Sequence, residues 1–249
     1  MNFWETAKIW LRSFLFNISF LLGTIFLCLF FLPLLMLPRK MIIVVTKCWI
    51  NYIFFLLKYC VGITYEVRGP IPKLPVIIAS KHQSAFETFV FHKILPPAVY
   101  LLKKELTYIP LIGWYLIKSG MIPIKRNRGS TPLKTLSAEI QKKLSNECSV
   151  IIFPEGTRTF PGEETSYKSG IALFYKLLET RVVPVALNSG LFWGRRSFLK
   201  KPGTVIIEFL DPIPPGLDSK IFLETLKNAI ETKSMELCSK NQMDLPYKR

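Results

Sequence analysis

A histidine and a carboxylate lie five positions apart in the segment Lys81 to Glu87, which reads Lys-His-Gln-Ser-Ala-Phe-Glu. The run before it, Leu74 to Ser80, has the composition of a strand, and the amphipathic stretch after Ser84 predicts a helix. Side chains five positions apart do not meet on an ideal helix. We therefore expect His82 on the loop before the helix and Glu87 in its first turn. There the carboxylate can bond one imidazole nitrogen and leave the other free to accept a proton.

The same residues also fit a purely structural role. Ser84-Ala85-Phe86-Glu87 has the S-x-x-E pattern of a capping box, in which the glutamate accepts a backbone N–H. Taken alone, these seven residues leave both interpretations open.

A second segment, Phe153 to Arg158, reads Phe-Pro-Glu-Gly-Thr-Arg and follows the buried strand predicted at Val150 to Phe153. Gly156 lets the backbone approach a ligand closely, but packing does not explain the two charges, Glu155 and Arg158. Further on, Lys168 lies where the next helix is predicted to begin, and it would add a cation beside free backbone amides.

A third segment is strongly basic: Lys125-Arg126-Asn127-Arg128 follows a strand predicted at Met121 to Lys125. Guanidinium groups match the geometry of a phosphate, so Arg126 and its neighbours could clamp one. A solvated basic patch on anionic lipid fits this run equally well.

Composition restricts the class of protein. The 249 residues are half hydrophobic, and 33 Lys and Arg against 17 Asp and Glu give a net charge of +16. Such charge attracts nucleic acid or an anionic membrane, and the apolar N-terminus favours the membrane. No nucleic-acid recognition motif is present. Five cysteines without a C-x-x-C pair indicate reduced, buried thiols and a cytosolic face, and two histidines are too few for a zinc site.

The N-terminal part is predicted to anchor the chain. Residues 14–37 contain no charge over 24 positions, more than the roughly 20 needed to cross a bilayer core. Residues 41–62 mix lysines with aromatic residues, as interfacial or partly inserted helices do. Basic residues flank the first stretch on both sides, so a spanning hairpin and one that enters a single leaflet both remain open. We expect residues 1–62 to form this helical anchor.

The sequence pattern of residues 63–249 predicts one globular α/β domain. Short β-rich runs alternate with helical patterns, which predicts a mixed, largely parallel sheet flanked by helices. A closing helix is expected over residues 218–241. The strand runs are Ile63 to Val67, Val76 to Ser80, Val99 to Leu102, Met121 to Lys125, Val150 to Phe153, Val182 to Leu187 and Val205 to Leu210. Ligands of such sheets bind at the carboxyl ends of the strands, so the three charged segments should share one edge.

Four blocks of this sequence resemble those of the glycerolipid acyltransferases in order and spacing. They are His82-x-x-x-x-Glu87, Gly120-x-Ile122-x-Ile124-x-Arg126, Phe153-Pro154-Glu155-Gly156-Thr157-Arg158 and Val183-Pro184-Val185-Ala186. The pattern is most similar to the 1-acyl-sn-glycerol-3-phosphate acyltransferases, the PlsC-like branch, over roughly residues 63–215. Three positions depart from it: Lys81 replaces an asparagine, Glu87 an aspartate and Thr159 a serine.

The resemblance implies an enzyme that moves a fatty acyl group from acyl-CoA or acyl carrier protein to the sn-2 hydroxyl of lysophosphatidic acid, giving phosphatidic acid. It implies His82 and Glu87 as the catalytic pair, with Arg126, Arg158 and Lys168 on the phosphate and Glu155, Gly156 and Thr157 shaping the acceptor site. The donor is a substrate, so neither a metal nor another cofactor is expected. Membrane lipids are the expected partners, at the cytosolic face of a membrane, the inner one in a bacterium.

Two alternatives stay open. An acyltransferase of the same superfamily could use glycerol-3-phosphate, another lysophospholipid or an ornithine-type lipid as acceptor. A membrane-anchored phospholipid-binding protein without catalysis is the other.

Overall fold

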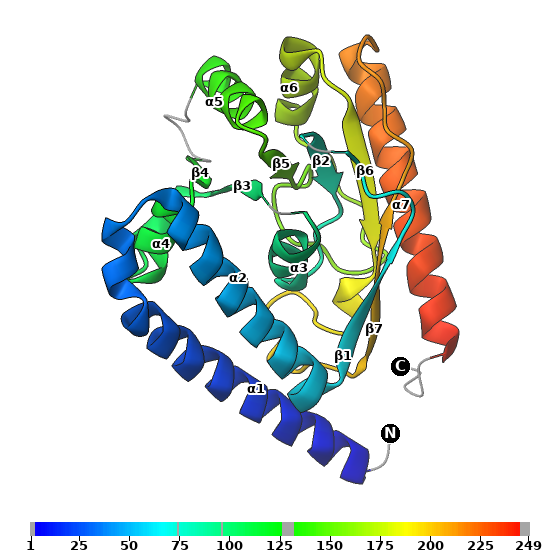
Figure 1. The fold of residues 1–249 in the computed structure, drawn as a ribbon. Helices are drawn as coiled ribbons and strands as arrows, with labels where there is room; N and C mark the ends of the chain where they lie inside the picture. The colour runs from blue at the N-terminus through cyan, green and yellow to red at the C-terminus, as the bar shows by residue number, and fades with distance from the viewer. Residues whose placement is uncertain (1–2, 74, 96, 126–131, 245–249) are drawn as a thin grey trace.

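Seven strands form one sheet in the computed structural model, which describes residues 3–73, 75–95, 97–125 and 132–244, the last four without side chains. The strands follow the order β1-β7-β6-β2-β5-β3-β4 across the sheet (Figure 1). All neighbouring pairs are parallel except β6 and β7, which confirms the prediction of a largely parallel sheet. The strands are β1 Ile63–Arg68, β2 Ile77–Ser80, β3 Ala98–Lys103, β4 Ile122–Ile124, β5 Ser149–Ile152, β6 Val182–Leu187 and β7 Gly203–Phe209.

Helices cover both faces of the sheet (Figure 1). Helix α3 (Phe86–Ile94) leads the chain from β2 towards β3, whereas α5 (Leu133–Ser145) and α6 (Gly170–Leu178) lead it back the other way. Parallel crossovers are right-handed, so α3 lies on one face and α5 and α6 lie on the other. The long closing helix α7 (Ser219–Asp244) packs beside α6 and against β6.

The N-terminal part is a pair of helices joined by a tight turn. Helix α1 (Phe3–Phe30) is followed by a 3-10 turn (Leu32–Met36), and α2 (Arg39–Leu56) ends in one π-helical turn (Leu57–Val61). Helix α1 begins well before the uncharged stretch that was predicted to start at residue 14. It ends before residue 37 because Pro33 lies in the first turn of the 3-10 segment and cannot continue the helical hydrogen bonds.

Polar groups tie the two N-terminal helices together inside an otherwise apolar contact. The hydroxyl of Tyr52 donates to the carbonyl of Ser19 at 2.6 Å, and the indole N–H of Trp49 donates to the Thr24 hydroxyl at 3.0 Å. Tyr52 passes so close to Gly23 that any side chain there would collide with its ring. Because these bonds satisfy the polar groups internally, the pair can sit in an apolar environment.

Helices α1 and α2 are both long and apolar enough to cross a membrane, judged by length and composition. The outward side of α1 exposes large apolar residues, among them Trp10, Phe14, Leu22, Phe26 and Phe30. Exposed apolar surface on this scale marks an interaction with lipid or protein. This supports the predicted membrane association.

The helical pair and the sheet share one hydrophobic core. Phe16 of α1 and Ile53 of α2 are fully buried in the same cluster as Ile77 of β2. Phe16 packs against Phe20 and Trp193, with ring centroids 5.8 and 5.5 Å apart. The boundary expected after residue 62 coincides with the start of β1, but the core continues across it.

One folded segment was not predicted. A 3-10 turn (Lys104–Tyr108) and helix α4 (Ile112–Lys118) connect β3 to β4. Pro110 and Gly113 interrupt the helical pattern there, yet Gly113 is required because a side chain would meet the carbonyl of Thr107. Tyr115 fastens α4 to α1 by donating to the carbonyl of Cys28 at 2.8 Å.

All five cysteines are free, as expected. Cys148 and Cys238 are buried, whereas Cys48 is exposed on α2. The prediction of burial was therefore wrong for Cys48, because apolar residues on this helix include outward-facing ones.

We expect Phe16→Ala to lower the free energy of unfolding by about 3–5 kcal/mol, because it leaves a cavity where α1 meets the core. Chemical denaturation in detergent micelles measures this loss. Phe14→Ala is the matched control, since Phe14 lies on the same helix with 50% of its surface exposed. Equal effects of the two substitutions would contradict the docking of α1 through Phe16.

Candidate active site

His82 lies on the loop that follows β2, as predicted, at the edge where the parallel strands end. The hydrogen bonds between β2 and β6 continue one residue into the loop, since Lys81 donates its N–H to the carbonyl of Val185 at 3.0 Å. The imidazole ring stacks on Phe153, with centroids 3.9 Å apart and planes 14° apart. The side chain keeps 12% of its surface exposed, enough to face a ligand while its ring plane is fixed.

Glu87 occupies the first turn of α3 and is completely buried. Its Oε1 lies 4.0 Å from Nδ1 of His82, a close contact but too long for a hydrogen bond. Three donors already hold this oxygen: the N–H groups of Gln83 at 2.6 Å and Ser84 at 2.9 Å, and the hydroxyl of Ser189 at 2.9 Å. Glu87 thus caps the helix and faces the histidine at once, so the two interpretations of the sequence are compatible.

Burial sets the acidity of this carboxyl. It raises the pKa of Glu87 to about 7, although the three donors act in the opposite direction. A carboxylate poised near neutrality responds strongly to a positive charge on the adjacent imidazole.

The segment Phe153 to Arg158 forms the turn after β5, next to the histidine loop. Gly156 has a φ of 71°, which only glycine adopts without strain. The N–H of Thr159 donates to the carbonyl of His82 at 2.8 Å and so joins the turn to that loop. Gly156, Thr157 and Arg158 line the pocket beside His82.

Glu155 does not line this pocket, contrary to the expectation that it shapes the acceptor site. It is buried and faces the other way, where its Oε1 lies 2.8 Å from the ammonium of Lys81. Its Oε2 accepts the backbone N–H of His82 at 3.2 Å. Glu155 therefore positions the histidine loop from the side away from the pocket.

Lys81 connects this arrangement to the C-terminal helix. Its side chain is 1% exposed, and its ammonium lies 2.8 Å from both Glu155 and Glu231 of α7. The hydroxyl of Tyr167 donates to Glu231 at 3.0 Å. Burial by itself would lower the pKa of Lys81, but the two carboxylates raise it. Burial raises the pKa of Glu155 to about 7. The ammonium of Lys81 lowers this pKa, but the nearby carboxylate of Glu231 raises it again.

One predicted phosphate ligand, Lys168, lies apart from the pocket lining. Lys168 is exposed and packs beside Gly156, with its Cγ 3.4 Å from where a Cβ would stand. Arg126 lies outside the residues that the structure describes.

The pocket beside His82 has a volume of about 380 Å³ and brings together cations that the sequence reasoning missed. Lys103 ends β3, and Arg195 and Arg196 lie in the loop between β6 and β7. Two consecutive arginines after the strand predicted at Val182 to Leu187 could have indicated a further anion-binding position. The charged and polar lining consists of His82, Thr88, His92, Tyr100, Lys103, Thr157, Arg158, Arg195 and Arg196.

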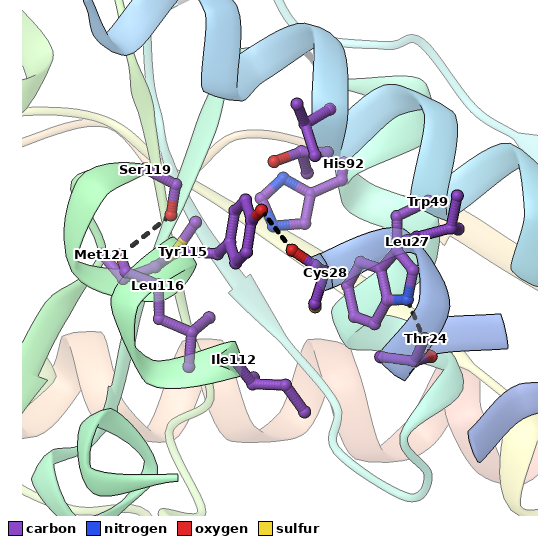
Figure 2. Close-up of a pocket in the computed structure, with 12 residues that line it drawn as sticks. Thr24, Leu27, Cys28, Trp49, His92, Ile112, Tyr115, Leu116, Ser119 and Met121 are labelled. Atoms are coloured by element: carbon purple, nitrogen blue, oxygen red, sulfur yellow. Dashed lines mark hydrogen bonds between the residues drawn. The ribbon is translucent and has the colours of Figure 1, made fainter. Parts of the chain in front are cut away.

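A smaller apolar pocket of about 70 Å³ adjoins this one between α1, α2 and α4 (Figure 2). Trp49, His92, Leu116 and Met121 line both pockets. The ring of His92 meets Tyr100 edge to face at 4.9 Å. Burial lowers the pKa of His92 to about 4, so its imidazole stays neutral at neutral pH. His92 of α3 thus lies between the two pockets.

We expect Lys81→Met to lower the free energy of unfolding by about 3–5 kcal/mol, because two carboxylates would stay buried without their cation. Adding Glu231→Gln should restore part of the loss.

Lys233→Met is the matched control for that measurement. Lys233 also pairs with two glutamates, Glu208 and Glu236, but is 28% exposed, so about 1 kcal/mol or less is expected. A loss of that size for Lys81→Met would show that the buried pairs do not fix the loop.

Known proteins resemble this chain in sequence. Residues 62–188, just over half of the chain, match the family described as Acyltransferase. The chain is 35% identical to the 1-acyl-sn-glycerol-3-phosphate acyltransferase of Pseudomonas aeruginosa over 75% of its own length and 72% of that protein. It is 28% identical to the human 1-acyl-sn-glycerol-3-phosphate acyltransferase beta, over 72% and 68% of the two chains.

A solved structure shares the fold. The crystal structure of the 1-acyl-sn-glycerophosphate (LPA) acyltransferase PlsC from Thermotoga maritima superposes with a TM-score of 0.69 at 19% identity. The match covers 96% of this chain and 98% of that one, so it includes the N-terminal helices. Matching blocks, a matching fold and a histidine with a buried carboxylate lead to one conclusion: the chain belongs to the acyltransferase family.

Proposed function

We propose that the protein transfers a fatty acyl group from a thioester to the sn-2 hydroxyl of 1-acyl-glycerol-3-phosphate, which yields phosphatidic acid. The single observation that carries this proposal is the position of His82. Its imidazole lies 4.0 Å from a buried carboxylate, at the wall of a pocket that also holds Arg158.

The chemical task is to activate a hydroxyl. An alcohol is a weak nucleophile near neutral pH, whereas a thioester already carries a good leaving group. His82 takes the proton of the hydroxyl while its oxygen attacks the acyl carbon. When the C–S bond breaks, the same imidazolium returns the proton to the departing thiolate. The acyl group then lies on the acceptor oxygen, and the proton of the hydroxyl lies on the released thiol. These steps require neither a metal nor a redox group.

Glu87 stabilises the charged intermediate of that cycle. The imidazolium forms beside a carboxylate from which water is excluded, where a charge interaction is stronger than in solvent. Its three hydrogen-bond donors hold Oε1 in place, so little reorganisation accompanies the proton transfer.

Arg158 supplies charge for the phosphate of the acceptor. Its turn is bonded to the His82 loop through Thr159, so a phosphate on Arg158 places the rest of the molecule near the imidazole. Arg126 and Lys168 are proposed to assist it, as the resemblance implies. Holding the hydroxyl in line with its base lowers the activation barrier of acyl transfer by roughly several kcal/mol.

The apolar pocket beside the site has room for a few methylene groups of a fatty acyl chain. It lies between α1, α2 and α4 and opens next to His92. Because α1 and α2 also form the apolar exterior, a lipid substrate reaches the pocket from the bilayer without crossing water. We propose that the α/β domain rests on the cytosolic face of the membrane, where acyl-CoA or acyl carrier protein is available.

We expect His82→Ala to reduce acyl transfer by at least about 10²- to 10⁴-fold, because the hydroxyl loses its base. Labelled acyl-CoA and acyl carrier protein, each tested against a panel of acceptors, measure transfer by product analysis. Binding to anionic vesicles should stay unchanged.

That assay also separates the alternatives. Transfer by the wild type to another acceptor, and none to 1-acyl-glycerol-3-phosphate, would reject the proposed substrate. Unchanged turnover in His82→Ala would reject the mechanism.

We expect Glu87→Gln to lower turnover by about 10²- to 10⁴-fold with little change in melting temperature, since the amide keeps an oxygen for the three donors but loses the charge. Ser84→Ala is the control for capping. The Ser84 hydroxyl accepts the N–H of Phe86 at 3.1 Å, so its loss should cost about 1 kcal/mol of stability and leave turnover nearly intact. If both variants lost stability and kept turnover, Glu87 would be a cap alone.

A further inference from the structure

The loop between β6 and β7 is fixed at its first end to the catalytic pair. The hydroxyl of Ser189 donates to Glu87 at 2.9 Å, and the N–H of Gly190 donates to the side-chain oxygen of Gln83 at 3.0 Å. Gln83 directly follows His82. The position of this loop therefore depends on the same residues that orient the imidazole.

The second end of the loop is fixed to the membrane helix α1. Lys200 is buried, and its ammonium donates to the side-chain oxygen of Asn17 at 2.6 Å. Its backbone N–H donates to the hydroxyl of Ser13 at 2.9 Å. The same ammonium lies 5.1 Å from the ring centroid of Trp193. A lysine this well enclosed restrains the loop and gives it a defined place over the pocket.

Arg195 and Arg196 lie between these two fixed ends, and both line the pocket of His82. An extended backbone would send consecutive side chains to opposite sides. Arg196 instead has a φ of 55°, a left-handed conformation that non-glycine residues rarely adopt. Strain of this kind persists where the surroundings impose it, and it is common at binding sites.

The charges of these residues are not balanced within the protein. Among the residues that the structure describes, Arg158, Arg195 and Arg196 form no ion pair with an acid. Burial lowers the pKa of Arg158, and the nearby charge of Arg195 lowers it further, although Glu87 acts in the opposite direction. Two half-buried guanidinium groups that line one pocket and repel each other are unfavourable unless an anion lies between them.

We propose that Arg195 and Arg158 together bind one phosphate monoester dianion, and that Arg195 thereby selects the acceptor lipid. This rests on the proposed function. Two guanidinium groups match the charge of a monoester, which is close to −2 at neutral pH, better than that of a phosphodiester, which is −1. The acceptor is the favoured source of the phosphate because the turn that carries Arg158 is bonded to the His82 loop.

The test compares Arg195→Ala with wild-type enzyme in mixed micelles. For the monoester acceptor 1-acyl-glycerol-3-phosphate, KM should rise about 10- to 100-fold with kcat nearly unchanged. For the phosphodiester lysophosphatidylglycerol, the slow transfer should change less than threefold, so discrimination between the two acceptors falls. Arg195→Lys should keep part of the discrimination. Melting temperature checks that both variants fold.

Arg181→Ala is the matched control. Arg181 is an exposed arginine immediately before β6, at the edge of the sheet opposite the site, and its loss should leave both KM values unchanged.

Three results would overturn the inference. A rise in KM for acyl-CoA alone would assign Arg195 to the phosphates of the donor. Unchanged KM values for donor and acceptor would remove it from substrate binding. A fall in kcat with KM unchanged would make it a structural support.

Binding of glycerol-3-phosphate, measured by calorimetry, separates this inference from the proposed function. If the wild type transfers no acyl group to 1-acyl-glycerol-3-phosphate but binds this soluble monoester in a way that Arg195→Ala weakens, the dianion site stands and the proposed reaction falls. If transfer occurs and Arg195→Ala changes nothing, the reaction stands and the inference falls.

Discussion

The ammonium of Lys81 holds three distant parts of the chain at one point. It follows β2, it binds Glu155 in the turn after β5, and it binds Glu231 in the closing helix α7. Because Lys81, Glu155 and Glu231 are all buried, the attraction between them replaces the stabilisation that water would give each charge. The backbone N–H of His82 is attached to the same carboxylate of Glu155. The histidine loop is therefore fixed by charges that lie beneath it, on the side away from the pocket.

Different partners give the two buried carboxyl groups near the histidine different tasks. Glu155 faces an ammonium and serves as a support. Glu87 faces the imidazole, its one oxygen is held by three neutral donors, and burial raises its pKa to about 7. Neither carboxylate is placed by its own helix or strand alone, because donors and partners come from the loops after β2 and β6 and from α7. Chemistry at this site is thus a property of the assembled edge of the sheet.

The two apolar N-terminal helices also belong to the site. Helices α1 and α2 supply walls of the apolar pocket, and Trp49 lines both that pocket and the one beside His82. Through Asn17 and Ser13, α1 also holds Lys200 and with it the loop that carries Arg195. A lipid that reaches the protein along these helices meets apolar surface first and the cationic pocket next.

The amino-acid sequence by itself determined the periodic features. Alternation of short β-rich runs with helical patterns was enough to predict all seven strands and the parallel sheet, since burial on both faces requires such runs. It also placed His82 on a loop and Glu87 in the first helical turn. The four blocks of residues indicated the family because they resemble those of the glycerolipid acyltransferases in order and spacing.

Only the tertiary structure decided which groups meet across the chain. Glu155 was expected in the pocket but turns towards Lys81, because a buried ammonium more than seventy residues away in the sequence needs it. Ser189 and Arg195 reach the site from the loop between β6 and β7, which contains none of the four family blocks. Local propensity fixes helices and strands, whereas the partner of a buried charge is set by long-range packing, which no short stretch of sequence contains.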